Sequence, residues 1–315
     1  MEHDVDEVQI EGHRGIVLAC RDTHLRAVVH PELAMLTSSL AHRGAELLGQ
    51  RNGIAAYADH GSTMGIPLLH PWANRLGATR YSLGGVDVAL DPGSGLLHFD
   101  DNGLPMHGLR LAGAGWLTGD PVAKESGASV SATLDFGATR ELLAAFPFPH
   151  RITVSTTISA AALETRVAIE ATGDLGVPLA LGFHPYFAPP GVERAAWELE
   201  TPVLRRADLD ERGIPTGVDH AVAPVRGPLA EQTFDDLYTD LADPPIFSVS
   251  GGGRRIALEF RVGYHVAQIY APSHDAVIAF EPMTAPTNAL QSGWMLRTVP
   301  PGGRVHTSFA VTIDG

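Results

Sequence analysis

Two residues combine acid–base side chains with strongly apolar surroundings. Glu281 follows the apolar run Val277–Phe280, and we expect it at the end of a buried strand. A carboxylate is costly to bury unless it is paired or used in chemistry. His184 lies within the segment Leu181–Phe187, where burial tunes the pKa of an imidazole. The two residues indicate a site that transfers protons; a solvated strand-end glutamate and a structural core histidine are the alternatives.

Polar residues that suit ligand binding follow an aromatic residue in the segment Leu68–Leu76. Trp72 is followed by Asn74 and Arg75. An aromatic ring can stack on the face of a sugar, and the neighbouring amide and guanidinium can bond its hydroxyls. The segment therefore predicts a sugar-binding loop, and a surface loop anchored by its tryptophan is the alternative.

A second histidine lies between glycines. His107 belongs to the segment Asn102–Leu109, in which Gly103 and Gly108 flank it. Glycine lacks a Cβ and lets the backbone approach a ligand closely. This segment predicts a second ligand-facing histidine, unless it is only a turn that carries one.

The sequence pattern predicts that β-strands position these residues. Apolar and polar residues alternate through 151–171, which predicts a hairpin, and shorter stretches near 86–90, 256–260 and 309–313 alternate in the same way. The 34 glycines and 23 prolines are spread along the chain, as expected of many short strands joined by turns. One or two helical turns are predicted at 138–145. We expect an all-β fold, a large antiparallel β-sandwich, with residues 1–315 as a single domain.

Composition narrows the function classes. Hydrophobic residues make up 44% of the 315 residues, and the net charge is −14, from 22 Lys and Arg against 36 Asp and Glu. Such a chain is globular, and its negative surface should repel nucleic acid and anionic membranes. We expect neither as a partner, whereas a neutral small molecule is compatible with that charge.

Several other chemistries lack their motifs. The chain has no Gly-x-Ser-x-Gly elbow, no phosphate-binding Walker loop and no close-spaced pair of metal-ligating histidines. Its one cysteine, Cys20, excludes an intrachain disulfide and a cysteine-based zinc site, and we expect it to be buried. The acidic N-terminal residues do not resemble a signal peptide, and no apolar run is long enough to span a bilayer. These features favour the cytoplasm.

Taken in their order along the chain, four segments resemble the aldose 1-epimerase (galactose mutarotase) family, in its bacterial mutarotase-like branch: those at Asn74–Arg75, His107–Gly108, His184–Phe187 and Glu281–Pro282. Two further stretches are similar to the family: Asp208–Gly217, with its Ile-Pro-Thr-Gly sequence, and Phe234–Tyr238, which resembles an acidic substrate loop. The resemblance covers residues 10–313. It implies the galactose mutarotase-like β-sandwich and an isomerase that acts on a free sugar as a monomer or a homodimer, with no metal or organic cofactor.

The resemblance also implies roles for matching residues. Glu281 matches the general base and His184 the general acid, and His107 matches a second active-site histidine. The implied substrate-binding residues are Asn74, Arg75, and Asp235 or Asp236, of which Asp235 fits the flanking aromatic residues better.

The implied reaction interconverts the α and β anomers of an aldohexose such as glucose or galactose. Glu281 takes a proton from the anomeric hydroxyl, and His184 donates one to the ring oxygen. Three rival functions remain open: a hexose-6-phosphate 1-epimerase, which would need a basic cluster, a non-catalytic carbohydrate-binding protein, and a glycoside hydrolase that uses Asp235 with Glu281. Arg205–Arg206 and Arg254–Arg255 are the only adjacent arginine pairs.

Overall fold

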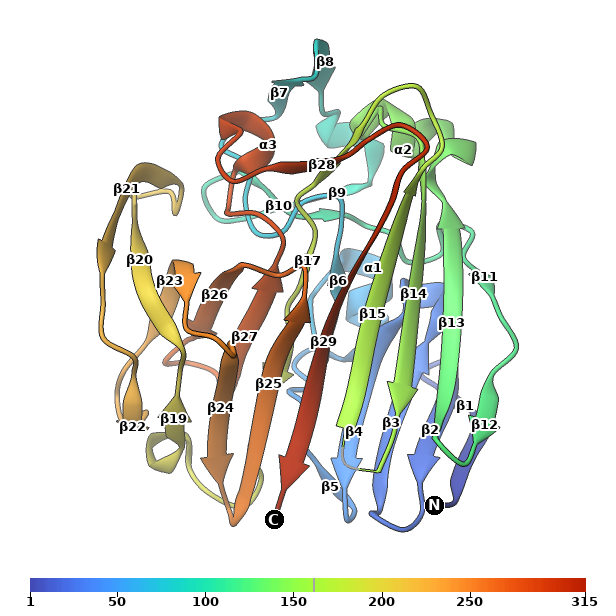
Figure 1. Ribbon diagram of the computed structural model, residues 1–315, viewed down its shortest axis with the longest axis vertical. Helices are drawn as coiled ribbons and strands as arrows, with labels where there is room; N and C mark the ends of the chain where they lie inside the picture. Colours follow the sequence, from blue (N-terminus) through green and yellow to red (C-terminus); the bar gives the residue numbers. More distant parts are fainter. Residues whose placement is uncertain (161) are drawn as a thin grey trace.

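Antiparallel strands build almost the whole molecule. A computed structural model describes residues 1–160 and 162–315. Its largest sheet has ten strands and crosses the front of the view in Figure 1. In spatial order these are β11 (Leu117–Thr118), β13 (Gly127–Asp135), β14 (His150–Ile158), β15 (Ala162–Ala171), β29 (Arg304–Asp314), β25 (Arg254–Val262), β24 (Ile246–Gly251), β19 (Glu198–Glu200) and β22 (Arg226–Pro228), with β12 (Val122–Lys124) paired to β13.

A second sheet of eight strands carries Glu281, Asp235 and Asp236, and two of its strands flank His184. Its spatial order is β21 (Pro215–Ala221), β20 (Val203–Leu209), β23 (Phe234–Leu241), β26 (Val266–Ala271), β27 (Ile278–Met283), β17 (Gly182–Phe183) and β6 (Leu68–Leu69), with β18 (Tyr186–Phe187) also paired to β27. Strand β27 is buried along its whole length, as the continuous apolar run predicts.

The N-terminal residues form a five-stranded meander whose strand β2 contacts β13 and β14 of the largest sheet. Its strands are β1 (His3–Ile10), β2 (His13–Cys20), β3 (Leu25–His30), β4 (Leu36–His42) and β5 (Ala45–Glu46). Three small pairs complete the β structure: β7 (Arg80–Leu83) with β8 (Val86–Ala89), β9 (Leu97–Phe99) with β10 (Pro105–Leu109), and β16 (Val177–Leu179) with β28 (Arg297–Val299).

The core lies between the sheets and is rich in aromatic rings. Phe183 of the eight-stranded sheet meets Phe309 of the ten-stranded sheet with ring centroids 5.0 Å apart, and Phe247 meets Phe280 at 5.3 Å. All four rings are fully buried, so each contributes a large hydrophobic area that joins the two layers. The predicted all-β sandwich is confirmed.

Local predictions agree in most places. The hairpin expected over 151–171 is β14 and β15, and their register pairs Val154 with Val167 on the buried face. The helical turns expected at 138–145 are α2 (Arg140–Ala145), and Cys20 is buried. Sequence analysis missed α1 (Gly53–His60) and the single turn α3 (Ala289–Ser292), because both are too short to show a clear helical period. Among the described residues, no helix is long and apolar enough to cross a membrane.

Two buried histidines form a direct contact beside the aromatic core. Nε2 of His70 lies 2.8 Å from Nε2 of His150, and Nδ1 of His150 lies 2.6 Å from the carbonyl oxygen of Phe148. The carbonyl can only accept, so Nδ1 of His150 carries the proton and its Nε2 accepts from His70. Burial lowers the pKa of His150 to about 4 and that of His70 well below its usual range, so both rings are neutral.

This pair predicts a fold that loses stability in mild acid. The pKa of His150 is about 4 in the folded chain against 6.5 in the unfolded chain, so the unfolded chain binds more protons. The neutral His150 ring therefore makes its full contribution to stability above the pKa of the unfolded chain, 6.5. That contribution declines as the pH falls toward the pKa of the folded chain, about 4. The thermal unfolding midpoint of the native protein should fall as the pH is lowered from about 7 to about 5. The midpoint of His150→Gln should fall less steeply over the same range. His306→Gln, at an exposed position of β29, is the control. Equal slopes in His150→Gln and the native protein would contradict this expectation.

Candidate active site

Strand pairing places His184 directly opposite Glu281. Strands β17 and β18 both pair with β27, and the two pairs share one register: Gly182 with Met283 and Tyr186 with Ala279. His184 lies midway between these pairs on its side, and Glu281 lies midway on the other. Nε2 of His184 is 3.1 Å from Oε1 of Glu281, and the two side chains are 4% and 1% exposed. The structure thus brings the predicted acid and base into direct contact.

Glu281 lies inside β27 rather than at its end, where we expected it. It is the fourth residue of the strand and pairs across to Gln268 of β26. Its side chain is only 1% exposed, so the carboxylate does not turn out to bulk solvent. Its Oε2 has no hydrogen-bond partner among the described residues. A buried carboxylate without a full set of partners requires a ligand or a chemical role.

Burial sets the protonation of this pair. It raises the pKa of Glu281 well above its usual range, and the nearby Asp235 adds to that effect while Arg75 opposes it. It lowers the pKa of His184 well below its usual range, and His107 and Arg51 add to that effect. Both shifts favour the neutral forms of the two side chains. The pair therefore shares one titratable proton, which resides mainly on the carboxyl group of Glu281. From the sequence we expected the resting proton on His184, whereas burial favours its placement on Glu281.

The second histidine predicted for the site lies beside the first. His107, on β10, has its ring centroid 5.3 Å from that of His184 in an edge-to-face arrangement. Its backbone has a φ of 63° and its amide donates to the carbonyl oxygen of Asn74. Burial lowers the pKa of His107 to about 3, so this imidazole is neutral and offers one donor and one acceptor.

Gly108 serves a different purpose from the one expected. A Cβ at this position would lie 2.3 Å from the carbonyl oxygen of His70, and its φ is 77°. The glycine therefore allows β10 to pack against the segment that begins at His70, rather than allowing the backbone to approach a ligand. This packing carries His107 to the same place as Asn74 and Arg75.

Arg75 is held by a network that only part of the sequence analysis anticipated. Its Nε donates to Oδ2 of Asp100 at 2.8 Å, and one terminal nitrogen donates to Oδ1 of Asn74 at 3.1 Å. The other terminal nitrogen lies 3.5 Å from Oδ2 of Asp235. Asp100 was missed; its signal is the sequence Asp-Asp-Asn-Gly, in which its other oxygen accepts the backbone amides of Asn102 and Leu104 and fixes the turn.

The adjacent residues Asp235 and Asp236 face opposite ways. They lie in strand β23, not in a loop as expected, and successive side chains of a strand point to opposite faces. Asp235 lines the cavity with Glu281 and accepts a hydrogen bond from Gln268 at 2.6 Å. Asp236 is not among the cavity-lining residues and lies 3.5 Å from a terminal nitrogen of Arg206.

Trp72 does not face a ligand. Its side chain is buried in the core, it is absent from the cavity lining, and the described residues offer its indole nitrogen no hydrogen-bond partner. The aromatic rings at the cavity are those of Phe99, Tyr186 and Tyr270. The sequence interpretation of this segment is therefore wrong for the tryptophan, while Asn74 and Arg75 do line the cavity.

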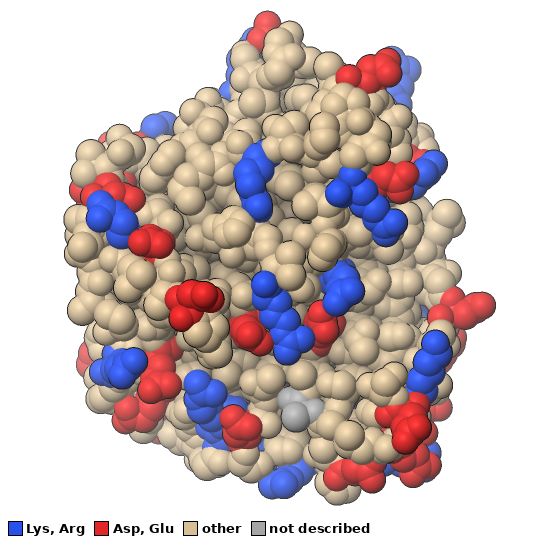
Figure 2. Space-filling view, viewed as in Figure 1, with Lys and Arg blue, Asp and Glu red and all other residues tan. Residues whose placement is uncertain are grey.

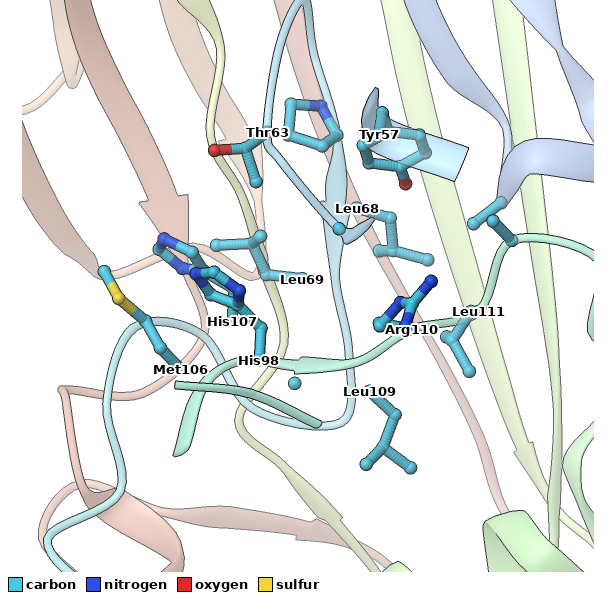
Figure 3. Close-up of a pocket in the computed structure, with 15 residues that line it drawn as sticks. Tyr57, Thr63, Leu68, Leu69, His98, Met106, His107, Leu109, Arg110 and Leu111 are labelled. Carbon is cyan, nitrogen blue, oxygen red and sulfur yellow. The ribbon is translucent and has the colours of Figure 1, made fainter. Parts of the chain in front are cut away.

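These side chains enclose a cavity of about 430 Å³. It is lined by Arg51, Thr63, Asn74, Arg75, His98, Phe99, Asp100, Asp101, Asn102, Met106, His107, His184, Tyr186, Asp235, Tyr270 and Glu281. A smaller hollow of about 30 Å³ adjoins it and shares four of its residues, Thr63, His98, Met106 and His107. Figure 3 shows this hollow, with His98 and His107 side by side opposite Tyr57 and Arg110.

The cavity suits a neutral polar molecule. Both of its arginines already have carboxylate partners: Arg75 contacts Asp100 and Asp235, and Arg51 contacts Asp275. Four acidic side chains line the walls, so the cavity carries no excess of positive charge. Within the described residues, no group of three His, Cys, Asp or Glu side chains is placed to hold a metal ion. Hydroxyl groups would find donors and acceptors on every side.

Solved structures with the same fold extend over the whole chain. A galactose mutarotase-like protein from Clostridium acetobutylicum superposes with a TM-score of 0.84 at 17% identity, covering 100% of this chain and 99% of that one. A Synechocystis protein gives 0.78 at 21% identity, with 100% and 98% covered. Galactose 1-epimerase from Lactobacillus acidophilus gives 0.76 at 15% identity, with 99% of both chains covered. At these identities the likeness shows the fold alone, and the fold is the predicted galactose mutarotase-like type.

Sequence comparison identifies the family. A search of curated proteins found no match. The sequence model described as aldose 1-epimerase matches residues 18–312, which is nearly the whole chain and includes every residue of the cavity. This chain is a member of the aldose 1-epimerase family.

Proposed function

We propose that this protein is an aldose 1-epimerase that interconverts the α and β anomers of a free, unphosphorylated aldohexose such as glucose or galactose. The observation that carries the proposal is the contact of 3.1 Å between Nε2 of His184 and Oε1 of Glu281 at the wall of a polar cavity. The family membership and the fold shared with a galactose 1-epimerase support it.

The reaction needs an acid and a base at neighbouring oxygens. The anomeric hydroxyl and the ring oxygen are bonded to the same carbon, so a base at one and an acid at the other must lie close together. Glu281 removes the proton from the anomeric hydroxyl while His184 donates one to the ring oxygen. The bond between the anomeric carbon and the ring oxygen then breaks, which leaves an open-chain aldehyde and a hydroxyl. Rotation of the aldehyde and reversal of both transfers give the other anomer.

The single proton of the pair supplies the acid. With the proton on His184, Glu281 is an anion and can act as base; burial favours the opposite placement, with the proton on the carboxyl. A bound sugar places hydroxyl groups against both side chains, and hydrogen bonds to the charged forms reduce the cost of moving the proton to the imidazole. Each proton transfer contributes about 10²–10⁴-fold to the rate.

Neighbouring residues hold the sugar. Arg75 and Asn74 present donors and an acceptor from one side, and Asp235 accepts hydrogen bonds from hydroxyl groups on another. His107, neutral with a pKa of about 3, stabilises developing negative charge through an N–H bond rather than through a positive charge.

Charge disfavours a sugar phosphate as the substrate. The arginine pairs singled out in the sequence do not line the cavity: Arg205 pairs with Asp219, Arg206 with Asp236, and Arg255 with Glu200. Figure 2 shows basic side chains scattered over one face of the molecule, several of them beside acidic ones. A phosphate needs a converging set of basic or backbone donors, which the cavity lining does not provide.

The first test concerns the acid–base pair. Glu281→Gln and His184→Asn should each lower the anomerisation rate of freshly dissolved α-glucose or α-galactose by about 10²-fold or more, measured by polarimetry, with sugar binding largely kept. The double variant should lose little more, because residues that act together are not additive. Glu125→Gln, in an exposed turn, is the control. Near-native activity in Glu281→Gln would end the relay mechanism and favour a carbohydrate-binding protein.

The second test concerns pH. The active form carries one proton on the pair, so the rate should fall in acid, when the pair gains a second proton, and in alkali, when it loses the shared one. The shifts of pKa assign the acid limb to His184, well below 6.5, and the alkaline limb to Glu281, well above 4.5. This reverses the simpler assignment, in which Glu281 protonates in acid and His184 deprotonates in alkali. Polarimetry against pH, with the double variant as the blank, checks it; a profile without an acid limb would contradict it.

The third test concerns substrate charge. Because the two arginines of the cavity are already paired with carboxylates, glucose should have the higher kcat/KM when it is compared with glucose 6-phosphate. Coupled assays for each anomer measure both. Faster turnover of the phosphate would show that the protein is a hexose-6-phosphate 1-epimerase.

A further inference from the structure

Arg51 lies next to the acid–base pair, but neither the sequence motifs nor the mechanism gives it a role. Its guanidinium carbon lies 4.7 Å from the centre of the Tyr186 ring. That ring stacks on the imidazole of His184, with centroids 4.1 Å apart and planes at 18°. The arginine, the phenol and the imidazole are therefore in sequential contact, and the imidazole contacts Glu281.

Hydrogen bonds hold Arg51 at both ends of its guanidinium. One terminal nitrogen donates to the hydroxyl of Tyr186 at 3.0 Å and to the carbonyl oxygen of Thr63 at 3.1 Å. Its Nε donates to Oδ2 of Asp275 at 3.1 Å. Three segments far apart in sequence thus fix one side chain, which is 21% exposed. A planar group with several directed bonds is well suited to hold a neighbouring ring in place.

The hydroxyl of Tyr186 lies within hydrogen-bond distance of His184. It is 2.6 Å from Oγ1 of Thr63 and 3.3 Å from Nε2 of His184. Because the two rings are stacked, the hydroxyl approaches Nε2 from outside the imidazole plane, where a hydrogen bond is weak. Oε1 of Glu281 lies 3.1 Å from the same nitrogen.

We propose that Arg51 is a positioning residue for the acid–base pair. Acting through Tyr186, it fixes the plane of the His184 imidazole and holds Nε2 3.1 Å from Oε1 of Glu281, and its positive charge keeps a second proton off the pair. The role in catalysis rests on the proposed function, whereas the effect on His184 does not.

The surrounding charges support this role. Besides Tyr186, the titratable and charged groups that face the pair or Arg51 are His98 of β9, His107 of β10, Arg75, Asp100 and Asp101 near the predicted sugar-binding segment, Asp235 of β23, Tyr270 of β26, and Asp275 between β26 and β27. Arg75 is matched by two carboxylates, but Arg51 is matched by one. The charge of Arg51 lowers the pKa of His184, second to burial and to His107.

Three variants separate charge from geometry. Arg51→Gln removes the charge, so the acid limb of the pH–rate profile should move upward by about one pH unit. Arg51→Lys keeps the charge but not the planar set of donors, so the limb should stay near its native position while kcat falls. Tyr186→Phe keeps the stacked ring and loses the hydroxyl, and kcat should fall more than KM rises. Arg26→Gln, on the exposed side of β3, is the control.

A second measurement does not depend on activity. The imidazole of His184 can be titrated by NMR in the protein without sugar, after assignment by comparison with His184→Asn. Its midpoint should rise in Arg51→Gln and stay unchanged in Arg26→Gln. A folded Arg51→Gln variant with a native midpoint and a native acid limb would overturn the proposal. If the native protein anomerises no sugar but the midpoint moves, the proposed function fails and the effect of the Arg51 charge on His184 stands.

Discussion

The site depends on one buried contact, that between His184 and Glu281. An isolated charge is very costly in a low-dielectric interior, and an ion pair recovers that cost only with good geometry and further hydrogen bonds. Here Oε2 of Glu281 and Nδ1 of His184 lack partners among the described residues. The interior thus favours a neutral pair that shares one proton, and a polar ligand can supply the missing bonds.

Strand register is what keeps this contact in place. Strand β27 is paired on one side to β26 and on the other to β17 and β18, so Glu281 cannot move without breaking backbone ladders on both sides. A shift of one residue would turn the carboxylate to the opposite face of the sheet. The aromatic contacts between the sheets, such as Phe247 with Phe280, resist such a shift. Glu281 is therefore carried by a strand that is buried along its length and paired on both sides.

The binding residues come from less regular segments, and their positions depend on backbone packing. Asn74 and His107 both adopt positive φ, and Gly108 fits against the backbone at His70. Non-glycine residues in this conformation are uncommon and carry a small energetic cost, which the surrounding hydrogen bonds offset.

Sequence alone determined the fold class and six of the residues that line the cavity. Apolar and polar residues that alternate with period two identified the hairpin β14–β15, because a half-buried strand must alternate in this way. Titratable side chains in apolar surroundings singled out Glu281 and His184. The order of motifs then indicated the family, and the sequence comparison confirmed it.

Only the tertiary structure decided which polar groups face the cavity. Asp235 and Asp236 are neighbours in sequence, and the pleat of β23 sends them to opposite faces. Trp72 looked like a sugar platform and is a core residue, since burial depends on what packs around it and not on its neighbours in sequence. Arg51 and Asp100 reach the site through contacts between distant segments, which no local pattern records. The resting place of the shared proton follows from burial as well, which exists only once the chain has folded.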